Sequence, residues 1–152
     1  MEEIVLKKLE LNKVLTSVAG YASLDETKRQ IVSLRPSVTL SEAEALLQLS
    51  AEADTALFRY GVGHIEVFPL LDDELERARK GAALSCGELL AVAALLRSAR
   101  VAYRSIQGLP EEYSVHLREI ASGIYFDEVL ERDISEKIIG EDEVSDYASD
   151  AL

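Results

Sequence analysis

The sequence predicts an all-α fold, and three observations support that prediction. Apolar residues recur at steps of three and four along most of the chain, which places them on one face of a helix. A hydroxyl residue followed three positions later by glutamate, a helix start signal, precedes the two longest of these stretches. Alternation of apolar and polar residues is confined to 65–68 and to the segment around Val144, which leaves room for a minor β-hairpin near the C-terminal end.

Three helices are expected in the N-terminal part, over about 12–22, 25–34 and 39–61. The second is stopped by Pro36, because proline cannot donate a backbone hydrogen bond inside a helix. The third carries the strongest apolar stripe, made of Ala43, Leu46, Leu47, Ala53, Leu57 and Phe58. Two pairs mark its start, Thr39 with Glu42 and Ser41 with Glu44, and both have the spacing of a capping box.

Four further helices are expected in the rest of the chain. Two of them begin at Pro69 and Pro110, since proline fits the first helical turn, where its missing N–H has no partner. Another covers 85–108, and Glu88 completes a capping box at its start. Its Ala-rich middle is apolar around much of the circumference, so we expect it near the centre of the fold. The last helix covers roughly 126–139.

The composition is that of one compact, acidic domain. The chain has 152 residues, with 28 Asp and Glu against 16 Lys and Arg, which gives a net charge of −12. No apolar stretch approaches the ~20 residues that cross a bilayer, and the first residues are acidic, unlike those of a signal peptide. The single cysteine, Cys86, excludes an intramolecular disulfide and fits a reducing compartment. We therefore expect a cytoplasmic protein that does not contact a membrane.

Charge is unevenly distributed along the chain. Between Arg77 and Arg104 there are six bases and one acid, a local net charge of +5, whereas 111–152 hold thirteen acids and three bases, a net charge of −10. Two interpretations stay open: solvated helix faces on different sides of the molecule, or a basic surface for phosphate or for a partner's acidic patch. Arg97, Arg100 and Arg104 share one helix face and are the candidate nucleic-acid or partner contacts.

Searches for catalytic, cofactor and metal motifs assign no residue to any of these roles. The glycines of 61–63 follow a predicted helix and lack the third glycine of a dinucleotide-binding loop, and no P-loop pattern occurs. His64 and His116 have no partner at a zinc-ligand spacing. Cys86 stands at a helix start, where a lone cysteine is more often a packing residue than a nucleophile.

Six short motifs, in order along the chain, resemble the extreme N-terminus of the type-two branch of the bacterial MutS family. The segments 6–15, 34–37 and 52–54 are similar to the family's "L…LEF.K(I/V)" start, "L.P" helix stop and acidic "EA" stretch, in that order. The segment 77–89 is similar to the family's "RA..G..LS..EL" pattern, and 132–134 together with 143–152 are similar to its "RDI…GEV.D.AS..L" end. The family usually has glycine where this chain has Asp142, a residue that tolerates a left-handed turn. The segment 61–68 matches the family's "G..P..G..D" loop poorly.

The resemblance implies that 1–139 form the helical N-terminal segment of a MutS-like core, and that 140–152 turn toward a lever helix outside this chain. The parent protein that it implies is a dimeric ATPase, which binds ATP and Mg in a separate domain and has a clamp and usually a C-terminal nuclease domain. Such proteins bind branched DNA and suppress homologous recombination, and some act on collided ribosomes. The resemblance therefore implies a non-catalytic segment that packs against the lever helices.

Two other functions remain open from the sequence. One is a free-standing adaptor whose acidic C-terminal third docks a basic partner, and the reading frame beyond Leu152 discriminates it from the MutS-like segment. The other is an enzyme with an unrecognised helical active site, which would need a concave pocket with converging titratable groups. A segment separated from its partner helices also leaves apolar surface uncovered, so we expect self-association.

Overall fold

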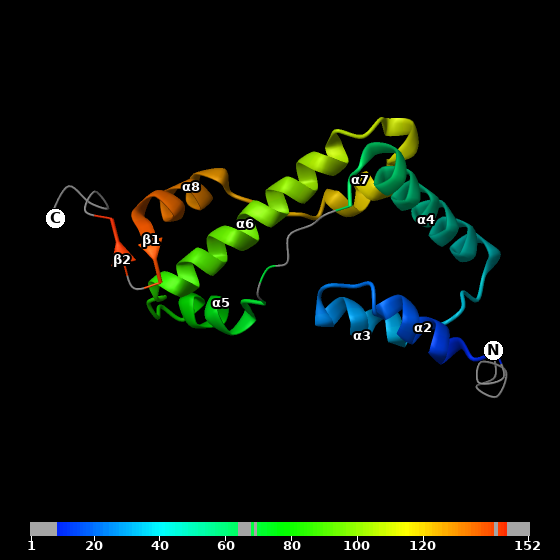
Figure 1. Cartoon of the computed structure of the whole chain (residues 1–152), viewed down its shortest axis with the longest axis horizontal. Helices are drawn as coiled ribbons and strands as arrows, with labels where there is room; N and C mark the ends of the chain where they lie inside the picture. The colour runs from blue at the N-terminus through cyan, green and yellow to red at the C-terminus, as the bar shows by residue number, and fades with distance from the viewer. Residues whose placement is uncertain (1–8, 64–67, 69, 142, 146–152) are drawn as a thin grey trace. The chain divides into compact units, whose positions relative to one another are not determined.

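The computed structural model describes residues 9–63, 68, 70–141 and 143–145, and within them it confirms the predicted all-α fold with a small hairpin near the C-terminal end (Figure 1). The elements are the α-helices α2 (Leu11–Ala19), α3 (Asp25–Ser33), α4 (Leu40–Tyr60), α5 (Asp72–Arg79), α6 (Cys86–Gln107), α7 (Val115–Ala121) and α8 (Glu128–Lys137), the 3-10 helix η1 (Glu111–Tyr113), and the strands β1 (Ile138–Gly140) and β2 (Glu143–Val144). Contacts along the chain form two compact units, residues 1–50 and 51–152.

The first unit is built on the packing of α2 against α3. Leu15 and Ala19, four residues apart on α2, are buried, as expected for the apolar face of an amphipathic helix. Helix α2 ends at Ala19, three residues before the predicted end, and Gly20 follows it. Helix α3 ends at Ser33, one residue before the predicted end, and Pro36 follows soon after, as the sequence indicates.

The start of α4 distinguishes the two predicted capping pairs. The N–H of Glu42 donates to Thr39 Oγ1 at 3.2 Å, and the Glu42 carboxylate accepts the N–H of Val38 at 3.2 Å, so Thr39 and Glu42 close the start of the helix. The second pair is wrong: Ser41 and Glu44 lie inside α4, which begins at Leu40. The first pair caps the helix because Thr39 satisfies the Glu42 N–H, one of the groups that a helix start leaves without partners.

The second unit is organised around α6, which contacts α7, α8 and β1 (Figure 1). Ala93 on α6 forms a buried apolar cluster with Ile134 on α8 and Ile138 on β1. The start of α6 has the predicted capping box: Ser85 Oγ accepts the Glu88 N–H at 3.3 Å, and the Glu88 carboxylate accepts the Ser85 N–H at 2.8 Å. The predicted capped start is confirmed, and within the second unit α6 is the helix that the other elements pack against.

Arg118 on α7 joins that helix to the C-terminal end of α6. Its guanidinium donates to the carbonyl oxygens of Gln107 (2.9 Å) and Leu109 (2.7 Å) and to Gln107 Oε1 (2.7 Å). It also donates to Ser114 Oγ at 3.0 Å, and the hydroxyl of this fully buried serine donates to the Pro110 carbonyl at 2.9 Å. The joint therefore satisfies carbonyl groups that the end of α6 would otherwise leave without donors.

The two helices predicted to begin at prolines begin later. Pro69 lies outside the described residues, and α5 starts at Asp72, with three acids in the first turn where the helix dipole favours them. After Pro110 only the single turn of η1 follows, because Ser114 has a non-helical φ of −147°. The helix then restarts as α7 at Val115, so the prediction of one helix from Pro110 is wrong.

The last helix ends earlier than the predicted 139, because the chain leaves α8 after Lys137 and forms the hairpin. Isoleucines 138 and 139 favour a strand over a helix, since their β-branched side chains lose rotamer freedom in a helix. Ile138 pairs with Val144 and Gly140 with Glu143 in an antiparallel, irregular register. The predicted minor hairpin is thus present, and it begins inside the segment predicted to be helical.

Some sequence-based predictions fall wholly or partly on residues outside the described part. These are the alternating segment 65–68, of which only Phe68 is described and has no strand structure, and the turn at Asp142. The division at 139/140 between a helical segment and a turn toward a lever helix stays a prediction. Among the residues that the structure describes, no helix has both the length and the apolar character needed to cross a bilayer.

Replacing Ser85 with alanine tests the capping box of α6. Ser85→Ala removes the hydroxyl that accepts the Glu88 N–H, and we expect it to lower the free energy of unfolding by about 1 kcal/mol, as is typical of a lost N-cap. Urea denaturation followed by circular dichroism measures this. Ser135→Ala is the matched control, because within the part of the chain that the structure describes this exposed serine donates only to the carbonyl one turn earlier in α8. Its effect should stay below ~0.5 kcal/mol, and equal effects of the two substitutions would contradict a stabilising cap.

Candidate functional site

The three arginines predicted as a contact surface do lie together on α6, and they face α8. Arg97, Arg100 and Arg104 are three and four residues apart, which puts them on one side of the helix. The Arg100 guanidinium donates to both carboxylate oxygens of Glu131, from Nε to Oε2 and from Nη2 to Oε1, each at 2.7 Å. A bidentate pair of this kind combines charge-assisted hydrogen bonds with a fixed relative orientation.

The other two arginines extend this contact along α8. Arg97 Nε lies 3.4 Å from Glu131 Oε1, and Arg104 Nη2 donates to Glu128 Oε1 at 2.6 Å. The two glutamates are three residues apart on α8, so their carboxylates project from the same side of that helix. We refer to Arg97, Arg100, Arg104, Glu128 and Glu131 as the α6–α8 ion-pair network.

Burial differs strongly between the members of this network. The side chains of Glu131 and Arg100 are 10% and 22% exposed, whereas those of Arg97 and Arg104 are 48% and 57% exposed. Exposed ion pairs contribute only ~0–1 kcal/mol to the stability of a fold, so the Arg100–Glu131 pair supplies most of the stability that this network provides. Hydrogen bonds from Arg100, and then from Arg97, hold the pKa of the Glu131 carboxyl below its usual value, although burial opposes them. The predicted basic face is therefore occupied by carboxylates of the same chain.

A second set of polar contacts fixes α5 at the start of α6. The Glu88 carboxylate accepts the Ser85 N–H and also pairs with Arg77 of α5. The hydrogen bond from the Ser85 N–H, followed by the one from Arg77, holds the pKa of the Glu88 carboxyl below its usual value. Cys86, the next residue after Ser85, is half-buried and packs against the buried cluster around Ala93. The structure thus places Cys86 among packing residues.

Sequence reasoning missed a contact that joins α4 to the start of α7. Glu52 Oε1 accepts the backbone N–H of His116 at 3.2 Å and lies 2.7 Å from the His116 Nδ1 atom, while Glu52 Oε2 accepts the Leu117 N–H at 3.0 Å. Glu52 therefore caps α7 from another helix. Burial raises the pKa of the Glu52 carboxyl, but the hydrogen bonds from Leu117 and His116 outweigh it and bring the pKa below its usual value. No local spacing reveals partners 64 and 65 residues away.

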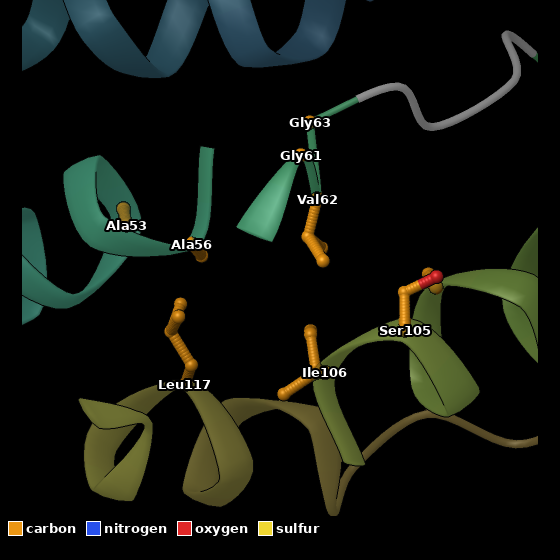
Figure 2. Close-up of a pocket in the computed structure, with 9 residues that line it drawn as sticks. Ala53, Ala56, Gly61, Val62, Gly63, Ser105, Ile106 and Leu117 are labelled. Carbon is orange, nitrogen blue, oxygen red and sulfur yellow. The ribbon is translucent and has the colours of Figure 1, made fainter. Parts of the chain in front are cut away.

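A cavity of about 250 Å³ lies beside this contact, between α4, α6 and α7 (Figure 2). It is lined by Ala53, Ala56, Gly61, Val62, Gly63, Ala102, Ser105, Ile106 and Leu117. In Figure 2 the side chains of Val62, Ile106 and Leu117 point toward the same space. Alanines and glycines supply most of the remaining wall and are too small to fill it. Because Ala53 and Gly61 are exposed, the cavity opens to solvent.

Possible metal ligands do not gather in the described ranges. No group of three or more His, Cys, Asp or Glu side chains there is placed to hold a metal ion. His116 is engaged by Glu52, and His64 lies outside the described residues. That the chain has no catalytic, cofactor or metal residue stays a prediction.

The described residues form an all-α fold with a small hairpin near the C-terminal end, and ion pairs between helices join the elements of the second unit. It is similar over its whole length to three proteins named Endonuclease MutS2, from Clostridium acetobutylicum (35% identical over 153 residues), Agathobacter rectalis (34% over 154) and Clostridioides difficile (30% over 155). Each alignment covers 100% of this chain and 19% of the relative. No family model and no solved structure matches the chain.

The chain belongs to the MutS2 family and corresponds to its N-terminal region. The resemblance to the type-two branch of the MutS family, predicted from six short motifs, is thereby confirmed. The chain spans about a fifth of the length of the curated relatives that it matches.

Replacing Glu131 with glutamine tests the α6–α8 ion-pair network. Glu131→Gln leaves Arg100 and Arg97 without a carboxylate, and we expect it to lower the free energy of unfolding at neutral pH by about 2–3 kcal/mol. Urea denaturation measures the loss. Glu128→Gln is the matched control, since among the described residues this exposed carboxylate pairs only with Arg104, and its loss should cost less than ~1 kcal/mol.

The same variant has a defined pH dependence. The folded pKa of Glu131 lies below its ordinary value of 4.5, so its stabilising contribution is complete above that value and is lost as the pH falls through the lowered folded pKa. The stability difference between the native chain and Glu131→Gln should therefore shrink below about pH 4.5. A difference of constant size throughout acid titration would show that the carboxylate charge is not what holds α8.

Proposed function

We propose that this chain is the non-catalytic N-terminal helical segment of a MutS2-type protein, a cytoplasmic DNA-binding ATPase that acts in DNA repair, suppresses homologous recombination and also acts on collided ribosomes. The observation that carries the proposal is the alignment of the entire chain with 19% of proteins named Endonuclease MutS2. ATP hydrolysis and DNA cleavage then belong to the remaining part of the parent, where ATP and Mg bind.

Exposed apolar side chains support a role in packing against that remaining part. Large apolar residues are exposed on α4, α8 and the hairpin, among them Leu47, Phe58, Val129 and Ile139. Apolar surface of this kind usually marks contact with other protein. We infer that the lever, clamp and ATPase domains of a homodimeric parent cover these residues, so that the segment passes ATP-driven movement between them.

The arginine face supports a structural role for this segment rather than a grip on nucleic acid. Affinity for DNA grows with the number of phosphates that Lys and Arg neutralise. Arg97, Arg100 and Arg104 already pair with carboxylates of α8, and the net charge of −12 repels a duplex. A phosphate would have to displace Glu128 or Glu131. We infer that other domains of the parent hold branched DNA or the ribosome.

The direct test compares the chain with the product of its complete reading frame. We expect the frame to continue past Leu152 into a P-loop ATPase, and the longer product to hydrolyse ATP and to bind branched DNA in a salt-sensitive manner. The 152-residue chain should do neither. In the longer product, the double substitution Arg97→Gln/Arg104→Gln should leave the DNA dissociation constant within about twofold, because both side chains face α8.

Three results would contradict the proposal or its parts. ATP turnover by the chain alone would make the segment catalytic. A stop codon after Leu152 would favour the free-standing adaptor, in which exposed acids such as Glu111, Glu112 and Glu119 dock a basic partner. Loss of DNA binding in the Arg97/Arg104 variant would establish the arginine face as a nucleic-acid contact.

Self-association tests whether the exposed apolar residues form a contact surface. We expect the mass of the chain, measured by light scattering after gel filtration, to rise with concentration, because uncovered apolar surface associates in water. Phe58→Ser should reduce this rise, since Phe58 is exposed on α4. Glu44→Ser, also exposed on α4, is the control and should not reduce it. A monomer mass at every concentration would argue against a large uncovered face.

A further inference from the structure

Arg59 at the end of α4 is held by two aromatic rings instead of a carboxylate. Its Cζ atom lies 5.2 Å from the centroid of the Tyr113 ring and 5.6 Å from that of Tyr60, and the two rings are 6.5 Å apart. The side chain is exposed. In the described part of the chain, no carboxylate or carbonyl oxygen accepts a hydrogen bond from Arg59, unlike Arg100 or Arg118.

Stacking on tyrosines orders a guanidinium without satisfying its N–H groups. The ring faces attract the cation, while the five N–H donors around its edge remain available. Such a pre-oriented fork matches the two oxygens of a carboxylate, and it loses less side-chain entropy on binding than a free arginine would. The geometry at Arg59 therefore suits an anion that approaches the edge of the guanidinium.

The apolar cavity begins two residues further along the chain. Gly61 and Val62 line its wall, and their positions are fixed because the Gly61 N–H donates to the Leu57 carbonyl at 3.2 Å and the Val62 N–H to the Ala56 carbonyl at 2.9 Å. Gly61 has a φ of +69°, which glycine adopts without strain. Arg59 thus lies two residues before the cavity wall, on the same hydrogen-bonded end of α4.

The cavity has room for one large apolar side chain. Its volume is about 250 Å³, and an apolar cavity of roughly 150 Å³ already admits benzene. The lining is almost entirely aliphatic, with Ser105 as its polar side chain. An apolar group entering it would lose contact with water and would gain contacts with Val62, Ile106 and Leu117, whose side chains point into the space (Figure 2).

We propose that the end of α4 binds an acidic peptide segment of a partner protein, in which a large apolar residue enters the cavity and a neighbouring aspartate or glutamate pairs with Arg59. Two independent features favour this ligand. The Arg59 guanidinium can pair with the carboxylate of the peptide, and the aliphatic cavity can hold its large apolar side chain. A polyanion such as single-stranded nucleic acid fits less well than a peptide with one carboxylate at Arg59, since Glu111 and Glu112, which directly precede Tyr113, repel each further phosphate and none of the described residues that line the cavity is basic. Tyrosine and arginine are also the residues enriched at the energetic centres of protein interfaces.

The test uses an acetylated, amidated tetrapeptide with 4-fluorophenylalanine followed by aspartate, observed by fluorine NMR in the presence of the 152-residue chain. We expect line broadening that saturates with the concentration of the chain. Replacing the aspartate of the peptide with asparagine, or the fluorophenylalanine with alanine, should weaken binding roughly tenfold or more, because each removes one of the two interactions.

Variants of the chain locate the site. Arg59→Gln and Ala53→Leu should each weaken binding roughly tenfold, the first by removing the charge and the second by filling the cavity. Arg132→Gln is the matched control, since Arg132 is another exposed arginine without a carboxylate partner among the described residues, and it should leave binding unchanged. Circular dichroism and thermal unfolding establish that each variant is folded.

The outcomes are distinct. Absence of peptide binding, equal binding of the asparagine peptide, or full binding by folded Arg59→Gln would overturn the proposal. Displacement of the peptide by an oligonucleotide in an Arg59-dependent manner would reassign the site to nucleic acid. None of these results depends on whether the chain belongs to an ATPase, so the failure of this proposal and the failure of the proposed function are separable.

Discussion

The contact between the Arg100 guanidinium and the Glu131 carboxylate is the constraint on which the second unit depends. It joins α6 to α8 through two hydrogen bonds of 2.7 Å at a largely buried carboxylate. Three residues along α8 from Glu131, Ile134 enters the buried cluster with Ala93 and Ile138. The ion pair and the apolar packing therefore set the same register of α8 on α6. A buried carboxylate without its partner would strongly destabilise that arrangement, so the two kinds of contact are linked.

Features of the fold that depend on neighbouring residues could be predicted from the sequence. The start of α6 is an example, because Ser85 and Glu88 lie within one turn and complete their hydrogen bonds locally. The break at Ser114 could not be predicted, since the Ser114 hydroxyl accepts a hydrogen bond from Arg118, whose other partners lie at the end of α6. For the same reason the cap that Glu52 provides for α7 has no local signature. The helical periodicity also predicts too long a last helix, because it includes Ile138 and Ile139, which lie in strand β1.

The arginine face illustrates the same limit at the candidate site. The spacing of Arg97, Arg100 and Arg104 correctly indicates one shared helix face, but spacing within a helix does not say what that face meets. The sequence left a solvated face and a basic surface as alternatives. In the structure, arginines of α6 form ion pairs with two acidic residues of the C-terminal third, Glu128 and Glu131. At Arg59 the situation is reversed, because aromatic side chains hold the cation and its hydrogen-bond donors stay available.

The joint made by Arg118 differs in kind from the other polar contacts between helices. Glu131, Glu88 and Glu52 hold their partners most strongly while they are ionised, because each accepts charge-assisted hydrogen bonds as a carboxylate. Arg118 instead donates to the carbonyls of Gln107 and Leu109, and a guanidinium keeps its charge at any pH that a protein tolerates. Acidification should consequently weaken the contacts that Glu131, Glu88 and Glu52 make with neighbouring elements, and should leave the Arg118 joint between α6 and α7 in place.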